Sequence, residues 1–250
     1  MDREGGPVRV PGAGEAVPSK APASIAGMFD AIAGRYDFLN HLLSAGLDRQ
    51  WRRRAIRSLQ LTGHERVLDL CTGTADLAIA ARRARPAAAR IVGIDFSSAM
   101  LEVGKAKVDA GGLSPSIALV RGDATRIPLG EGGVQGVTIG FGIRNVEKPD
   151  VACAEMHRVL APGGRLAVLE FAIPTAPVVR PLYLWYFRHV LPRVGRVVSR
   201  HDAAYAYLPD SVGGFATPPE FVKMLRHAGF RDIRAVPLTL GIVYLYTATR

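Results

Sequence analysis

Acidic residues stand at or near the ends of three short apolar runs, where a carboxylate could bind hydroxyl or amino groups of a ligand. Asp69 lies in the first run, Asp95 closes the second, and Asp123 follows the third. A carboxylate in the position of Asp95 can accept hydrogen bonds from both ribose hydroxyls of an adenosine. Asp123 can accept from an adenine amino group, and Ala124 offers its backbone N–H. Each acid alone is more often a cap or a turn residue, but three at successive strand ends predict one crevice.

The loop after Asp69 is poor in glycine. It reads Thr72-Gly73-Thr74-Ala75, whereas a dinucleotide site has the pattern G-x-G-x-x-G. Thr72 and Ala75 stand where the close approach of a diphosphate favours glycine, and this disfavours an NAD(P)-linked oxidoreductase. Acids suit a nucleoside that carries positive charge instead of phosphates. S-adenosylmethionine, with its sulfonium, is such a nucleoside, and we expect it as the cofactor.

The elements that must position these residues are strands that alternate with helices. Such alternation predicts βαβ units and an α/β fold with a doubly wound, mostly parallel sheet. Strands are expected at 66–71, 90–95, 116–120, 134–140, 165–171, 232–236 and 243–249. Helices are expected from about 76 and over 97–109, 150–160 and 218–228.

Residues 25–250 are expected to form one domain. It would begin with a helical cap at 25–61 and carry an insertion at about 175–215, before the last helix. Residues 1–24 are rich in Gly, Pro and Ala and lack apolar periodicity, so we expect a flexible tail.

The composition is that of a globular protein, with 48% apolar and 22% charged residues. It excludes a disordered chain, a collagen-like chain and a coiled coil. Two cysteines cannot build a disulfide framework, and no apolar stretch is long enough for a membrane span or resembles a secretory signal, so we expect a cytoplasmic protein.

The net charge of +10 is concentrated in residues 48–66 and 171–201. Such blocks suit an anionic partner, either nucleic acid or a lipid headgroup layer.

Several motifs resemble those of a known family. The run 69–76 followed by Asp95 resembles the core of class I S-adenosylmethionine-dependent methyltransferases. Between about Met28 and Ala248, further segments resemble the signatures of the ubiquinone/menaquinone biosynthesis C-methyltransferases: Tyr36-Asp37-Phe38-Leu39-Asn40, Ser44-x-Gly46, Trp51-Arg52, Phe141-Gly142-Ile143-Arg144-Asn145-Val146, Arg158-Val159-Leu160-x-Pro162-Gly163-Gly164-Arg165, Leu169-Glu170-Phe171, His189-Val190-Leu191-Pro192-Arg193-x-Gly195, Tyr205-x-Tyr207-Leu208 and Leu238-Thr239-x-Gly241-Ile242-Val243.

The resemblance implies a seven-stranded sheet that binds S-adenosylmethionine, and methyl transfer to a ring carbon of a polyprenylated quinol. It places a set of residues beside the cofactor: Thr74, Asp95, Asp123 and Ala124, with Asp69, Gly73 and Gly140 at the same edge. Gly140 stands where the family often has serine, and this difference removes one hydroxyl contact.

A quinol ring carbon is a weak nucleophile, and loss of a phenolic proton activates it. A base or a cation near the hydroxyl should therefore help. Our hypothesis is that Tyr36 and Arg144 line the quinol pocket, with Asn145 as orienter, and that Arg144 favours the phenolate electrostatically. Alternatively, Tyr36 is a core residue with a wet hydroxyl, and Arg144 forms a structural ion pair. His201 is a further candidate base. The other histidines and the cysteines lack metal-ligand spacing, so no metal is expected.

The insertion is aromatic and basic. Trp and Tyr of residues 181–191 precede Arg193, Arg196 and Arg200, which could share one helix face. Such a segment suits a lipid headgroup interface, from which an enzyme could draw a polyprenyl substrate. We therefore expect peripheral contact with the inner face of the membrane. The same aromatics could form a lid over the quinol.

The sequence is compatible with other acceptors and other functions. The acceptor could be a naphthoquinol, as in the conversion of demethylmenaquinol to menaquinol, or a benzoquinol of ubiquinone biosynthesis. An RNA methyltransferase would account for the net charge, but the fourth strand ends in Phe141-Gly142-Ile143-Arg144-Asn145 and not in an acidic-aromatic motif, so no nucleic acid is expected. A quinone-binding protein without catalytic activity would keep the fold. An oligomer is compatible with the sequence.

Overall fold

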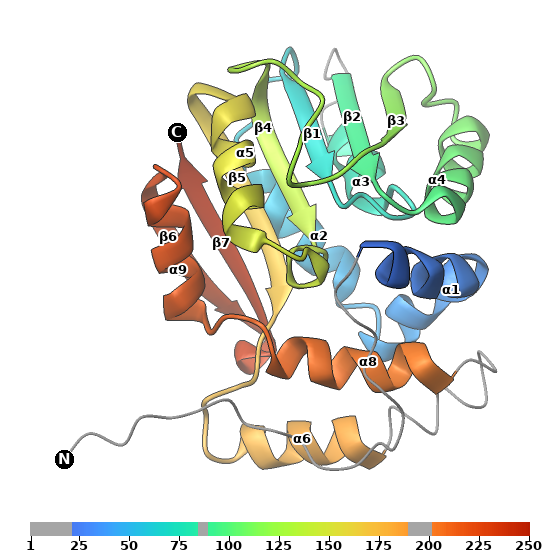
Figure 1. Ribbon diagram of the computed structural model, residues 1–250, viewed down its shortest axis with the longest axis vertical. Coiled ribbons are helices and arrows are strands. Elements are labelled where there is room, and N and C mark those ends of the chain that lie inside the picture. Colours follow the sequence, from blue (N-terminus) through green and yellow to red (C-terminus); the bar gives the residue numbers. More distant parts are fainter. Residues whose placement is uncertain (1–21, 85–89, 190–201) are drawn as a thin grey trace.

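Seven strands form one sheet in the centre of the protein (Figure 1). The computed structural model describes residues 22–84, 90–189 and 202–250. The strand order is β3-β2-β1-β4-β5-β7-β6. The first five of these strands are parallel to one another, and β7 is antiparallel to both β5 and β6. The doubly wound, mostly parallel sheet is thus confirmed. The strands are β1 (Arg66–Leu70), β2 (Arg90–Asp95), β3 (Ile117–Arg121), β4 (Val134–Gly140), β5 (Leu160–Phe171), β6 (Arg231–Leu238) and β7 (Val243–Thr249).

Helices cover both faces of the sheet. The described helices are α1 (Pro22–Leu43), α2 (Asp48–Ser58), α3 (Asp76–Ala84), α4 (Ser98–Ala110), α5 (Pro149–Val159), α6 (Val179–His189), α8 (Asp202–Gly213) and α9 (Pro218–His227), with the short turns η1 (Ile143–Asn145) and η2 (Thr239–Gly241). Successive side chains of β5 alternate between two cores. Leu166 and Val168 pack with α5 and α9, whereas Ala167 and Leu169 pack with α2 and α3. This double burial explains why the strands do not alternate between apolar and polar residues.

α1 and the helices of the insertion lie beyond the carboxyl ends of the parallel strands (Figure 1), whereas α2 packs on one face of the sheet. α1 and α2 form the predicted helical cap, and α1 packs on α4 through Ile32 and Ala33 against Met100. α1 begins at Pro22, inside the predicted tail, because proline suits the first turn of a helix. The rest of that tail, residues 1–21, lies outside the described residues. α6 and α8 belong to the insertion and lie below the strand ends in this view.

Two strands are longer than the sequence predicted. β5 begins at Leu160, not at Arg165, because Leu160 pairs with Val134 before the register shifts at Gly136. β6 runs through Pro237, which is tolerated because β6 is an edge strand and proline donates no hydrogen bond to a neighbour.

Candidate active site

A buried carboxylate organises the loop after β1. Asp69 accepts hydrogen bonds from Thr72 Oγ1 at 2.5 Å and from Thr138 Oγ1 at 2.7 Å. Burial raises the pKa of Asp69 to about 6, although both hydroxyls favour the charged form. Asp69 is not among the residues that line the two cavities described below. The structure therefore makes it a positioning residue beneath the loop, whereas the sequence analysis had placed it with the cofactor contacts.

Asp95 joins the ends of β1 and β2. Its carboxylate accepts hydrogen bonds from the backbone N–H of Gly73 at 2.8 Å and of Ser97 at 2.9 Å. Asp95 is buried, and this burial raises its pKa. Gly73 has a φ of +53°, in the left-handed region, and no heavy atom lies within 4 Å of the place where a Cβ would stand. The loop thus presents open backbone next to Asp95.

A small cavity of about 140 Å³ lies at this edge of the sheet. Asp95, Asp123 and Ala124 line it together, as the sequence predicted, and Asn145 completes one side. Asp123 is exposed, and its Oδ1 accepts hydrogen bonds from the N–H and the hydroxyl of Thr125, both at 2.8 Å. Carboxylate acceptors beside a backbone N–H fit the hydroxyl and amino donors of an adenosine. The residues present therefore fit the nucleoside part of S-adenosylmethionine.

Thr74 connects the loop to the cap. Its hydroxyl donates a hydrogen bond to Asp37 of α1. Lys107 of α4 donates to Thr74 at 3.2 Å and to Asp37 at 2.6 Å, and it also pairs with Asp76 at the start of α3. Neither Thr74 nor Gly140, at the end of β4, is among the residues that line the small cavity. The cap contact of Thr74 was not predicted, because the sequence does not show which residue of α1 faces the loop.

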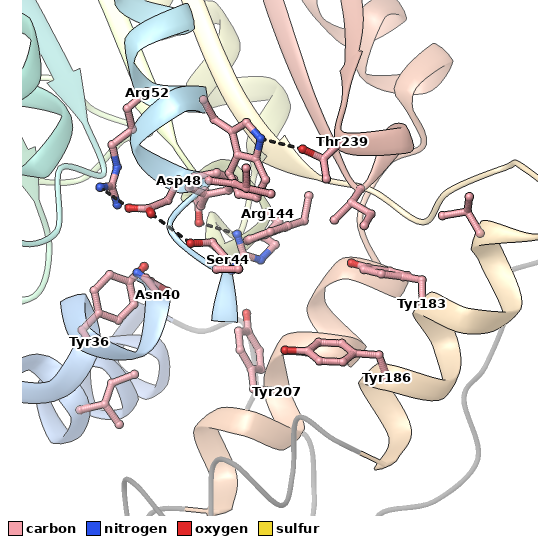
Figure 2. Close-up of a pocket in the computed structure, with 18 of the residues that line it drawn as sticks. Tyr36, Asn40, Ser44, Asp48, Arg52, Arg144, Tyr183, Tyr186, Tyr207 and Thr239 are labelled. Carbon is pink, nitrogen blue, oxygen red and sulfur yellow. Dashed lines mark hydrogen bonds and ion pairs between the residues drawn. The ribbon is translucent and has the colours of Figure 1, made fainter. Parts of the chain in front are cut away.

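A larger cavity of about 530 Å³ lies between the cap, α6, α8 and the ends of β4 and β5 (Figure 2). This volume is in the usual range of small-molecule sites. Its wall is mostly aromatic and apolar and includes two arginines: Phe29, Ile32, Tyr36, Trp51, Phe141, Phe171, Leu182, Tyr183, Trp185, Tyr186, Tyr207, Arg52 and Arg144. The chemistry of the wall suits a flat, apolar molecule with few polar groups.

Residues of η1 line both cavities. Arg144 lines the larger cavity, whereas Asn145 lines the smaller one. Successive side chains of a 3-10 turn point about 120° apart, since the turn has three residues. Asn145 therefore lies at the wall of the smaller cavity and not in that of Arg144. It is linked to that cavity through Tyr207, whose hydroxyl donates to Asn145 Oδ1 at 3.1 Å.

Arg144 is a buried cation of the larger cavity. It forms an ion pair with Glu170 at 2.7 Å, donates to Ser211 Oγ at 3.3 Å and lies 5.4 Å from the centroid of the Phe171 ring. Burial alone would lower the pKa of Arg144, but the charge of Glu170 and the nearby tyrosines raise it. The guanidinium therefore stays charged. Both interpretations of Arg144 apply, because it has a structural ion pair and also faces the cavity.

Tyr36 contributes a phenol from α1 to the same cavity (Figure 2). Burial raises the pKa of Tyr36, while a hydrogen bond with Asn40 and the charge of Arg144 act in the opposite direction. The ring packs edge-on against Phe29, with centroids 6.0 Å apart. At neutral pH the hydroxyl is therefore protonated and available as a hydrogen-bond donor.

The sequence analysis gave no role to two further residues of this cavity. Trp51 donates from Nε1 to Thr239 Oγ1 at 2.9 Å and so ties α2 to η2. Asp48 is buried and binds Arg52 at 2.7 Å and Ser44 Oγ at 3.0 Å. Both residues lie in or near the motifs Ser44-x-Gly46 and Trp51-Arg52, but these motifs do not show which side chains the two residues contact.

His201, Arg193, Arg196 and Arg200 lie outside the described residues. In the part of the chain that the structure describes, no three His, Cys, Asp or Glu side chains are grouped so as to hold a metal ion. No helix within that part is long and apolar enough to cross a bilayer.

The sheet order and the carboxylates at the ends of β2 and β3 define a class I S-adenosylmethionine-dependent methyltransferase. A methyltransferase of this kind from Aquifex aeolicus has a similar fold, with a TM-score of 0.59 and 18% identity over 91% of this chain and 96% of that one. The chain belongs to the ubiE/COQ5 methyltransferase family, whose model matches residues 18–250.

Two curated relatives illustrate the family. The ubiquinone/menaquinone biosynthesis C-methyltransferase UbiE of Geobacter sp. (strain M21) is 46% identical over 90% of this chain and 96% of its own length. The demethylmenaquinone methyltransferase of Thermus thermophilus is 42% identical over 89% of this chain and 100% of its own.

Proposed function

We propose that this protein transfers the methyl group of S-adenosylmethionine to a ring carbon of a polyprenylated quinol and converts demethylmenaquinol to menaquinol. The observation that carries the proposal is the large aromatic cavity with a buried cation, Arg144, whose neighbour Asn145 lines the acid-lined cavity. The names of the relatives from Geobacter and Thermus support the acceptor class.

On the donor side, Asp95 and Asp123 would hold the ribose and adenine groups, and the loop at Gly73 and Thr74 would hold the remainder of the cofactor. When bound, S-adenosylmethionine supplies an electrophilic methyl group on a sulfonium. The backbone of Gly73 is already fixed by Asp95, so the loop needs little reorganisation. Most of the catalysis would come from holding the two reactants in line.

On the acceptor side, Arg144 would stabilise the phenolate that forms when a quinol hydroxyl loses its proton. The charge then spreads to the ring carbon beside it, which would bond to the methyl group as the methyl–sulfur bond breaks. The ring carbon would then lose its own proton while the quinol oxygen regains one, so that S-adenosylhomocysteine and one proton are released. The guanidinium acts in a water-poor, aromatic site, where a fixed charge is most effective. Tyr36 would donate a hydrogen bond to a quinol oxygen, and Asn145 would steady Tyr207 between the cavities.

We also propose that the protein contacts the inner face of the membrane peripherally, because its substrate carries a polyprenyl chain. We expect no nucleic acid substrate, since aromatic and apolar side chains dominate the wall of the larger cavity. A benzoquinol remains the second candidate acceptor, favoured by the double name of the Geobacter relative.

The test is transfer of a labelled methyl group by the purified protein to short-chain demethylmenaquinol, to the corresponding benzoquinol and to bulk tRNA. We expect label on the naphthoquinol ring carbon and none on tRNA. A preference for the benzoquinol would assign the second acceptor. Label on tRNA, or on none of the three acceptors, would contradict the proposal.

A further inference from the structure

The outward side of α6 carries large, exposed apolar side chains. Val178 is 81% exposed, Leu182 66% and Trp185 55%. Leu182 and Trp185, three residues apart, lie on one side of α6, and Val178 lies in the turn directly before it. Val179 and Tyr183, on the inward side, line the larger cavity. A helix that is apolar on both sides is normally covered on both, so the outward side is expected to have a partner.

The exposed residues of α6 stand at an opening of the larger cavity. Leu182 and Trp185 line that cavity although more than half of each side chain is exposed, so the cavity reaches the surface there. Leu47, before α2, is also exposed and lines the cavity, and Leu240, 73% exposed, follows a lining residue in η2. We call this set the mouth surface: Leu47, Val178, Leu182, Trp185 and Leu240.

The mouth surface gathers most of the exposed large apolar side chains of the described residues. Only Val120 and Val151 in that part of the chain lie outside it. Exposed apolar residues scattered singly are ordinary, but their concentration around one opening marks an interaction site.

Positive charge flanks the mouth surface. Arg49 and Arg53 are exposed on α2, and Arg180 is exposed on α6. The acid of α2, Asp48, is buried and paired with Arg52, and α6 has no acidic residue. An apolar rim with arginines around it complements a layer of anionic headgroups over hydrocarbon.

We propose that the mouth surface docks on an anionic lipid bilayer, so that the larger cavity opens toward the hydrocarbon. The quinol ring would enter the cavity while the distal isoprene units stay in the membrane. This inference rests on the proposed function, since a polyprenyl substrate is what makes such an orientation useful. It adds a surface that the sequence did not show, because Leu47 and Leu240 come from segments far from α6.

The test is flotation with vesicles of phosphatidylcholine and phosphatidylglycerol. The double variant Val178→Glu/Leu240→Glu alters two exposed residues that do not line the cavity, and Val151→Glu on α5 is the matched control. We expect the double variant to bind about tenfold more weakly, because charge replaces the apolar contact, and the control to bind as the wild type does. Equal binding of the double variant and the wild type would overturn the proposal.

A second arm tests the charge. Arg49→Gln/Arg180→Gln should weaken binding to anionic vesicles, and Arg226→Gln on α9 should not. Binding that is the same on pure phosphatidylcholine would overturn the anionic part of the proposal. Light scattering of the wild type and of Val178→Glu/Leu240→Glu tests whether a second copy of the chain occupies the mouth surface. A dimer that the double variant dissociates would assign the surface to a second copy of the chain and overturn membrane docking.

Turnover of a short-chain, water-dispersed quinol separates this inference from the proposed function. We expect all these variants to keep that turnover and Val178→Glu/Leu240→Glu to lose turnover of a long-chain quinol embedded in vesicles. If the wild type binds vesicles but methylates neither quinol, the proposed function fails while docking stands. If the double variant methylates the embedded quinol normally, the docking inference fails while the function stands.

Discussion

At the scale of single residues, the proposed acceptor chemistry depends on Arg144. Its guanidinium is held by Glu170 and by the carbonyl of Phe141, so its position is fixed by buried partners. Lysine keeps the charge but loses the planar fork. We expect Arg144→Lys to lower the turnover number about 100-fold, the usual loss when one stabilising donor is removed, with little change in cofactor affinity.

Steady-state kinetics with a short-chain quinol check this prediction, and titration with S-adenosylhomocysteine reports on the cofactor site. Arg226→Lys on α9 is the control. Normal turnover of Arg144→Lys would remove Arg144 from the chemistry. A loss confined to cofactor affinity would instead move it to the donor side.

The pH dependence of stability tests the positioning residue Asp69. Its pKa of about 6 in the folded protein lies above the usual 3.8, so the native state binds this proton more tightly than the unfolded state does. The cost of the buried charge is therefore small at pH 4, where the carboxyl of the unfolded chain is already about half ionised, and nearly complete at pH 7, where it is about 3 kcal/mol. Asp69→Asn removes that cost.

The expected result is that the free energy of unfolding of Asp69→Asn, relative to wild type, rises by about 2 kcal/mol between pH 4 and pH 7. Urea denaturation at both values measures it. The variant is compared with the wild type at each pH, so the contributions of other titrating groups to the free energy of unfolding cancel. A difference between the two proteins that does not change with pH would refute the raised pKa.

Residue-level prediction succeeded where strand ends bring residues together. Asp95, Asp123 and Ala124 line one cavity because parallel strands end at one edge. The side of η1 on which Asn145 lies was not predictable, because the sequence does not show that η1 turns neighbouring side chains to different cavities.

At the scale of elements, two cations join the cap to the elements around the loop after β1: Lys107 of α4, and Arg52 of α2, which pairs with Asp76 at 2.9 Å. Lys107 of α4 contacts Asp37 of α1, Asp76 of α3 and the hydroxyl of Thr74. These pairs are partly exposed, so each contributes little to stability. Loss of Lys107 leaves Asp37 without its cation beside Thr74, while Asp76 keeps Arg52. We expect Lys107→Met to weaken binding of S-adenosylhomocysteine roughly tenfold, a change of about 1.4 kcal/mol.

Calorimetric titration measures that change. Lys105→Met, an exposed lysine on the same helix, is the matched control and should bind as the wild type does. Equal affinities for Lys107→Met and Lys105→Met would show that the cap contact does not support the cofactor loop.

The order of strands and helices was predictable because both carry clear apolar patterns and turn residues. The contacts between the cap and the loop were not predictable. Asp37 and Lys107 are 70 residues apart, and nothing in the composition of α1 shows which side chain reaches α4. The extra length of β5 was also missed, because glycine and proline at its start normally indicate a loop.

At the scale of the whole molecule, the net charge of +10 and the mouth surface act together. Attraction to anionic lipid is screened by salt, whereas binding of a neutral quinol is not. We expect an increase from about 0.05 M to about 0.5 M salt to release the protein from anionic vesicles and to leave short-chain quinol turnover unchanged. Flotation and turnover at both concentrations check this. A parallel loss of both quantities would show that salt acts on the active site instead.

The central claim is that the two cavities form one active site, with the methyl donor at Asp95 and the quinol at Arg144. The most direct measurement is transfer of a labelled methyl group to short-chain demethylmenaquinol by the wild type, Asp95→Asn and Arg144→Lys at increasing S-adenosylmethionine. We predict that saturating cofactor restores most of the turnover of Asp95→Asn and none of that of Arg144→Lys. Absence of transfer by the wild type, or the same response to cofactor in both variants, would contradict the account.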